Sequence, residues 1–228
     1  ASFALLGVSP LAARKIVDAV RARKVYARWK RPRRFERNVV VIGAGSAGLV
    51  TSYIAAAVKA KVTLVERHRM GGDCLNYGCV PSKALIRTAK VLSQAKRAKD
   101  FGLKNATVEF DFAEVMERVQ RVIKAIEPHD SLERYRGLGV ECIQGEAKIL
   151  SPWIVEIQLP DGTKQALTTC AIVIAAGARP FVPPIPGLAD GPYFTNETLF
   201  ERVPVPTHLI VLGGGPIGGD DPRAPHRG

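Results

Sequence analysis

A short segment built around a glycine-rich turn constrains the fold of this chain more than any other feature. Residues 38–43 read NVVVIG, an apolar, β-branched run typical of a buried parallel strand. The turn GAGSAG follows over residues 43–48, then a helical stretch of small residues to about Lys59, and a second strand, KVTLVE, over residues 61–66. This order of strand, glycine turn, helix and strand predicts a βαβ unit in a parallel sheet.

The glycine spacing in this turn is typical of dinucleotide binding. Gly43 permits the tight turn, Gly45 lets the backbone approach a pyrophosphate, and Gly48 lets helix and strand pack closely. The pyrophosphate would lie at the helix N-terminus, where free N–H groups favour anions. Glu66 ends the second strand, where a carboxylate can accept hydrogen bonds from ribose hydroxyls. The alternative is an ordinary glycine-rich connection, but the flanking strand, helix and acid favour a dinucleotide.

The stretch GGDCLNYGCVPSKAL, residues 71–85, concentrates two thiols and a cation. Pro81 stands where a helix can begin, so we expect Cys79 at or near a helix N-terminus, which lowers a thiol pKa. The gap of four residues allows the chain to loop back and join Cys79 to Cys74. Lys83 lies one helical turn beyond Cys79 and on the same face. Two buried thiols or half a zinc site are the alternatives, but a zinc site needs two more ligands at suitable spacing.

The four cysteines are too few for a disulfide-stapled secreted domain. Cys142 and Cys170 are isolated, and we expect them to pack. A close pair with two scattered cysteines suits a reducing compartment, so a cytoplasmic location is expected, with the inner face of a membrane as an alternative. The sequence has no run of about 18 apolar residues that would cross a bilayer.

Most of the positive charge belongs to residues 1–37. These carry eleven basic and two acidic residues, or +9 of the formal net charge of +12. Ser9–Arg31 is predicted to form a basic amphipathic helix that Pro32 ends. It is either a solvated linker helix or a segment that lies against anionic lipid. Nucleic-acid binding is disfavoured, because no nucleic-acid motif is present.

The remaining elements alternate between helices and strands. Two helical stretches are expected, the second of them interrupted by Pro128, and then a strand, an antiparallel meander and a second strand with a glycine turn. In the same order, these predictions cover residues 80–99, 112–134, 139–147, 153–177 and 207–218.

Together with the later segment AIVIAAGARP (residues 171–180), these motifs resemble the pyridine nucleotide–disulfide oxidoreductases. These are FAD flavoproteins such as dihydrolipoamide dehydrogenase, glutathione reductase and mercuric reductase. The cysteine stretch is most similar to those of dihydrolipoamide dehydrogenase and mercuric reductase. The resemblance covers residues 38–218. It implies an α/β fold with a Rossmann-type FAD-binding domain, in which helices flank a parallel sheet that carries a small antiparallel β-meander. The implied division is a basic helical leader (1–37), the FAD-binding domain (38–200) and the start of an NAD(P)-binding domain (201–228).

The resemblance also implies roles for individual residues. Cys79 would lie against the flavin, Cys74 would be the outer sulfur that meets the substrate, and Lys83 would lie near the reactive flavin nitrogen. The full set of implied cofactor contacts comprises Gly43, Gly45, Ser46, Ala47, Gly48, Glu66, Arg67, Gly72, Asp73, Cys74, Gly78, Cys79, Lys83, Ala147, Ala176, Gly177 and Arg179. No metal ligands are implied. Asp73 and Ala176 depart from the family pattern, because relatives have threonine at both positions.

The implied activity is electron transfer from NAD(P)H through FAD to a Cys74–Cys79 disulfide, and from there to a disulfide, dithiol or metal-ion substrate. The family is homodimeric. The end of the sequence, GDDPRAPHRG, departs from the family because Asp220 stands at a glutamate position and Pro222 and Pro225 disfavour a helix. We therefore expect a truncated nicotinamide domain, no dimerisation domain and no efficient nicotinamide turnover by this chain alone. The alternatives are a non-catalytic flavin-binding fragment and an interaction module docked on a membrane surface.

Overall fold

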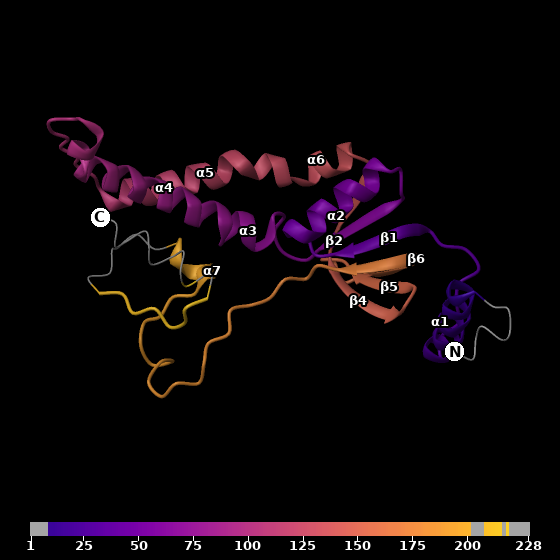
Figure 1. Ribbon diagram of the computed structural model, residues 1–228. Helices are drawn as coiled ribbons and strands as arrows, with labels where there is room; N and C mark the ends of the chain where they lie inside the picture. Colours follow the sequence, from indigo (N-terminus) through magenta and orange to yellow (C-terminus); the bar gives the residue numbers. More distant parts are fainter. Residues whose placement is uncertain (1–8, 202–207, 216–217, 219–228) are drawn as a thin grey trace.

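A six-stranded sheet forms the centre of the computed structural model, which describes residues 9–201, 208–215 and 218 (Figure 1). The strand order is β3-β2-β1-β6-β5-β4. The first four of these strands run parallel to one another, and β6, β5 and β4 form an antiparallel meander. The predicted parallel sheet with a small meander is therefore confirmed. The strands are β1 (Arg37–Ile42), β2 (Val62–Glu66), β3 (Val140–Gln144), β4 (Glu146–Ser151), β5 (Ile154–Gln158) and β6 (Lys164–Ile174).

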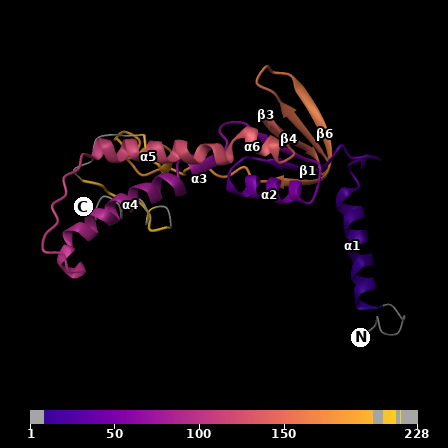
Figure 2. The same cartoon turned by 90° about the horizontal axis from the view of Figure 1, so that it is seen from above.

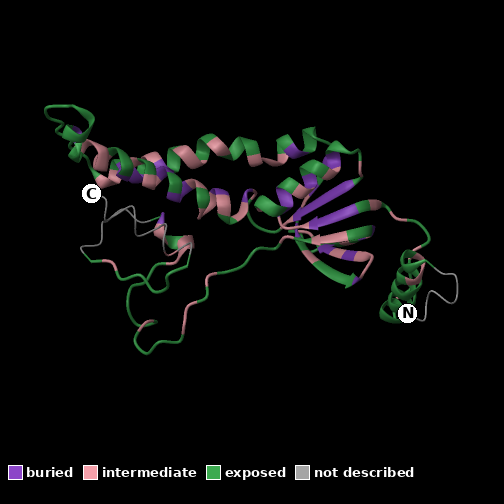
Figure 3. Ribbon diagram, viewed as in Figure 1, coloured by how far each residue is buried: buried purple, intermediate pink, exposed green. Residues whose placement is uncertain are grey.

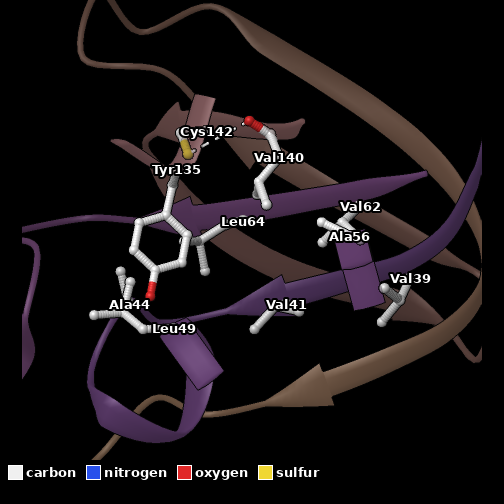
Figure 4. Packing of buried hydrophobic residues seen from close by; sticks show 10 residues of the cluster. All are labelled: Val39, Val41, Ala44, Leu49, Ala56, Val62, Leu64, Tyr135, Val140 and Cys142. Carbon is white, nitrogen blue, oxygen red and sulfur yellow. Dashed lines mark hydrogen bonds between the residues drawn. The ribbon is translucent and has the colours of Figure 1, made fainter. Parts of the chain in front are cut away.

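The long strand β6 joins the two parts of the sheet. Its first half, residues 164–168, pairs with β5, and its second half, residues 169–174, pairs with β1. Successive side chains of a strand point to opposite faces, so β1 contributes to two cores. Val39 and Val41 pack in the core under the helices (Figure 4), and Val40 packs with the meander. All three valines are buried because both faces of the sheet are covered.

Helices cover one face of the sheet and extend beyond its end (Figures 1 and 2). α2 (Ser46–Ala57) and α6 (Leu132–Gly137) supply Leu49, Ala56 and Tyr135 to the core over β1–β3. Next to them, α3 (Gly72–Asn76) leads into α4 (Cys79–Lys96), which packs against α5 (Phe112–Ile126). The short helices are η2 (Ala98–Phe101), η3 (Glu127–Asp130) and α7 (Asn196–Leu199). The predicted interruption at Pro128 is confirmed by η3, which separates α5 from α6.

The basic leader forms α1 (Pro10–Tyr26), and the Ser9 side chain caps its N-terminus. The prediction that Pro32 ends this helix is wrong. Helical hydrogen bonding stops earlier, where the Trp29 N–H bonds to the Tyr26 carbonyl and the Tyr26 ring packs on Trp153 with 5.2 Å between centroids. α1 buries none of its side chains (Figure 3). Among the residues that the structure describes, no helix has the length and apolarity to cross a membrane.

Two further predictions are corrected. Of the strand expected over residues 207–218, the described residues 208–215 form none, and Ile210 is 86% exposed. A strand is stabilised by a paired neighbour, and no strand in the described part of the chain lies beside this run. Cys170, which was expected to pack, is exposed, because alternation along β6 buries its neighbour Thr169 instead. The predictions on Asp220, Pro222 and Pro225 lie outside the described residues.

Candidate cofactor and redox site

Two glycines of the turn at the end of β1 have no room for a side chain. Gly43 has φ +101°, and a Cβ built on it would lie 2.3 Å from the Ala175 carbonyl oxygen. A Cβ on Gly48 would lie 1.8 Å from the Gly43 carbonyl oxygen, because the first turn of α2 presses against the strand end. Both glycines are therefore required by backbone packing, as the spacing predicted.

The N-terminus of α2 is open toward solvent and suited to an anion. Gly45 is the N-cap, so no side chain satisfies the first N–H groups, and the first turn has no acidic residue. A second glycine segment lies close to this point, since a Cβ on Gly72 would come 2.6 Å from the Gly45 Cα. Two backbone segments thus form a cradle around free N–H donors, which is the arrangement that binds a phosphate group.

The carboxylate of Glu66 joins the end of β2 to the glycine turn. It accepts hydrogen bonds from the Ala44 N–H at 2.6 Å and from the His68 N–H at 2.7 Å. The next residue, Arg67, forms an ion pair with Glu146, with 3.7 Å between Nη1 and Oε1. The predicted acid is therefore beside the turn, and each of its oxygens keeps acceptor capacity for a ligand hydroxyl.

A cleft of about 1090 Å³ opens at the carboxyl ends of the parallel strands, where α/β sheets bind ligands. It exceeds the volume of about 300–1,000 Å³ that is common for small-molecule sites. Thirteen of the predicted cofactor residues line it: Gly43, Gly45, Ser46, Ala47, Glu66, Arg67, Gly72, Asp73, Cys74, Ala147, Ala176, Gly177 and Arg179.

Four predicted residues, Gly48, Gly78, Cys79 and Lys83, lie outside the walls of the cleft. Gly48 is buried beneath the turn. Gly78, Cys79 and Lys83 lie at the start of α4, the helix that follows α3. Sequence reasoning missed other wall residues, most of which lie beside predicted residues in the chain. These include His68, Arg69, Asn76, Tyr77 and Glu197.

The cysteine pair lies at the junction of α3 and α4. Cys74 belongs to α3 and borders the cleft, and Cys79 is the first residue of α4, as the position of Pro81 predicted. The chain turns back between them, because a Cβ on Gly78 would lie 3.7 Å from the Cys74 Cα. Both cysteines are free thiols in this structure. Among the described residues, no group of three or more His, Cys, Asp or Glu side chains could hold a metal ion.

Burial raises the pKa of the Cys74 thiol to about 11, and the hydrogen bond with Cys79 and the charges of Cys79 and Asp130 act in the same direction. The charge of Lys83, whose side chain is exposed, lowers the pKa of Cys74 and so opposes these effects. Sequence reasoning missed Asp130, at the end of η3. Its own pKa is raised by burial, against the opposing charges of Arg134 and His129.

Comparison with known proteins places this geometry in a family. Residues 37–220 match the family model for pyridine nucleotide-disulphide oxidoreductases. The chain belongs to that family. The family match covers both the glycine turn with its cleft and the cysteine pair.

Individual relatives agree with this assignment. A dihydrolipoyl dehydrogenase of Chlorobaculum parvum is 36% identical over 190 residues, 79% of this chain and 38% of the relative. A mercuric reductase of Bacillus cereus is 33% identical over 184 residues, 81% of this chain and 28% of the relative. The flavoprotein disulfide reductase RclA from Escherichia coli, solved as a copper(II) complex, aligns with a TM-score of 0.67 and 25% identity, over 82% of this chain and 39% of RclA. The chain thus spans less than half the length of these relatives.

Proposed function

We propose that this chain supplies the FAD-binding and dithiol–disulfide part of a flavoprotein disulfide oxidoreductase. The observation that carries the proposal is that Cys74 borders the same cleft as the glycine turn and Glu66. The wall of one cleft therefore offers both N–H donors for a phosphate and a sulfur. A dinucleotide cofactor is the class of ligand that would reach both.

The residues fit FAD by their shape and their donors. The glycine turn and the uncapped N-terminus of α2 would hold the pyrophosphate, and Glu66 would accept hydrogen bonds from ribose hydroxyls. Asp73 is a departure, because its negative charge in the cleft wall opposes an anionic ligand. Arg67 and Arg179 line the same cleft and offset that charge. When bound, FAD would supply two-electron transfer between a nicotinamide and the cysteine pair.

The cysteine pair would perform thiol–disulfide exchange. One thiolate attacks a sulfur of a substrate disulfide, forms a mixed disulfide and releases one substrate thiolate. The second cysteine then attacks the enzyme sulfur of that mixed disulfide, so the Cys74–Cys79 bond closes and the second substrate thiolate leaves. The pair loses two electrons and two protons, and the substrate becomes two thiols. The charge of Lys83 opposes the burial that raises the pKa of Cys74, but does not outweigh it. A dithiol substrate would drive the same steps in reverse, and the family also includes metal-ion reductases.

A thiol count on the purified, FAD-reconstituted chain tests the proposal. After reduction the denatured chain should show four thiols, and mild oxidation with diamide should leave two. Cys74→Ser should give three thiols before and after oxidation. The control Cys170→Ser, which removes an exposed cysteine outside the pair, should still lose two thiols on oxidation. Flavin absorption without any loss of thiols would contradict the redox half and leave a non-catalytic flavin-binding protein. An absence of flavin binding would contradict the cofactor half.

A further inference from the structure

The exposed surface of α1 is not explained by the redox site. Ala13, Ile16, Val17 and Val20 recur at the i, i+3, i+4, i+7 spacing of one helical side, which we call the α1 apolar face. No side chain of α1 is buried, and Val20 is 60% exposed. A helix of a globular domain normally packs such a face against its own core. Here the face has no partner in the part of the chain that the structure describes.

The same segment carries a dense and exposed positive charge. Residues 9–34 contain ten basic side chains, all exposed, and a single acidic one, Asp18. That acid pairs only weakly with Arg14, at 4.0 Å between charged atoms. The basic side chains are Arg14, Lys15, Arg21, Arg23, Lys24, Arg28, Lys30, Arg31, Arg33 and Arg34. Uncompensated charge of one sign on an exposed helix complements a surface of the opposite sign.

The segment is fastened to the sheet at the end opposite the cleft. Tyr26 packs on Trp153, and the Arg31 guanidinium lies 5.8 Å from the Trp153 ring centroid. Trp153 accepts a backbone hydrogen bond from Thr169, whose partner in β1 is Arg37, the first residue of that strand. The cleft begins at Ile42, the last residue of β1. The length of that strand, about 20 Å, therefore separates the cleft from the point where the basic segment is attached.

We propose that α1 and the basic residues that follow it dock this protein on an anionic lipid surface. The combination of an apolar face and flanking cations fits an interfacial helix, which lies in the headgroup plane with its apolar side toward the acyl chains. A nucleic acid would use the charges but not the apolar face. Docking at this end leaves the redox cleft directed away from the lipid, where a substrate still has access.

Vesicle sedimentation of the full chain tests the proposal. We expect binding to phosphatidylcholine vesicles with 30% phosphatidylserine, little binding to phosphatidylcholine alone, and loss of binding in 0.5 M salt. The triple variant R21Q/R23Q/K24Q should lower the affinity about a hundredfold, at roughly fivefold per basic side chain. The matched control K90Q/K99Q/K104Q removes the same charge from exposed positions on the α4–α5 hairpin and should bind like the unmodified chain.

A second pair of substitutions separates lipid from nucleic acid. Ile16→Ser with Val20→Ser keeps every charge and should weaken vesicle binding about tenfold, because it removes apolar area from the interface. Since neither side chain is buried, the melting temperature should not change, which excludes misfolding. Equal binding to both vesicle types, unchanged vesicle binding by either variant, or binding only to a single-stranded RNA followed by fluorescence anisotropy would each overturn the proposal.

Discussion

Gly48→Ala tests whether the glycine turn is fixed by backbone packing. The added Cβ would lie 1.8 Å from the Gly43 carbonyl oxygen, whereas unstrained Cβ contacts begin near 3.4 Å. Either α2 or the turn must therefore shift by more than 1 Å, and overpacking of this kind costs about 1–3 kcal/mol or more. Alanine in a helix is favoured over glycine by only about 1 kcal/mol. The clash therefore decides that the substitution lowers the free energy of unfolding. Because the 1.8 Å contact places the clash at the upper end of that range, about 3 kcal/mol, we expect a net destabilisation of about 2 kcal/mol.

Urea unfolding and thermal melts measure this effect. A loss of about 2 kcal/mol corresponds to a fall in melting temperature of about 4–8 °C for a chain of this size. Gly137→Ala is the matched control, because it also lies in a helix, has no positive φ, and has no atom within 4 Å of the added Cβ. It should be neutral or slightly stabilising. The packing argument fails if Gly48→Ala is as stable as Gly137→Ala.

Two further predictions concern charged groups. Asp130→Asn removes a charge that raises the pKa of Cys74, so this pKa should fall below about 11. Iodoacetamide should then alkylate Cys74 faster at pH 8.5, and an unchanged rate would contradict this charge effect. Burial of Glu141 raises its pKa, but hydrogen bonds from Thr63 and Arg37 outweigh burial and lower it. The stability that ionised Glu141 contributes to the fold is therefore present above about pH 4.3, and it is lost as pH falls through the folded-state pKa of Glu141. Glu141→Gln should flatten the acid limb of the stability curve, and an identical limb would refute this.

Local sterics explain why much of the site could be predicted from the sequence. Gly43 and Gly48 are required by contacts within one strand–turn–helix unit, and Glu66 follows from where β2 ends. Pro81 likewise sets the start of α4 beside Cys79. Each prediction depended on residues close together in the chain, where φ/ψ limits and helix geometry act without regard to the rest of the fold.

The sequence by itself determined the βαβ unit, the acid at its end and the cysteine junction, because spacing and backbone sterics specify these features. Only the tertiary structure decided which distant groups meet them. The placement of Asp130 near Cys74 and the packing of Tyr26 on Trp153 depend on pairings between segments far apart in the chain. No local pattern encodes such pairings, since burial and charge contacts arise when whole elements pack together.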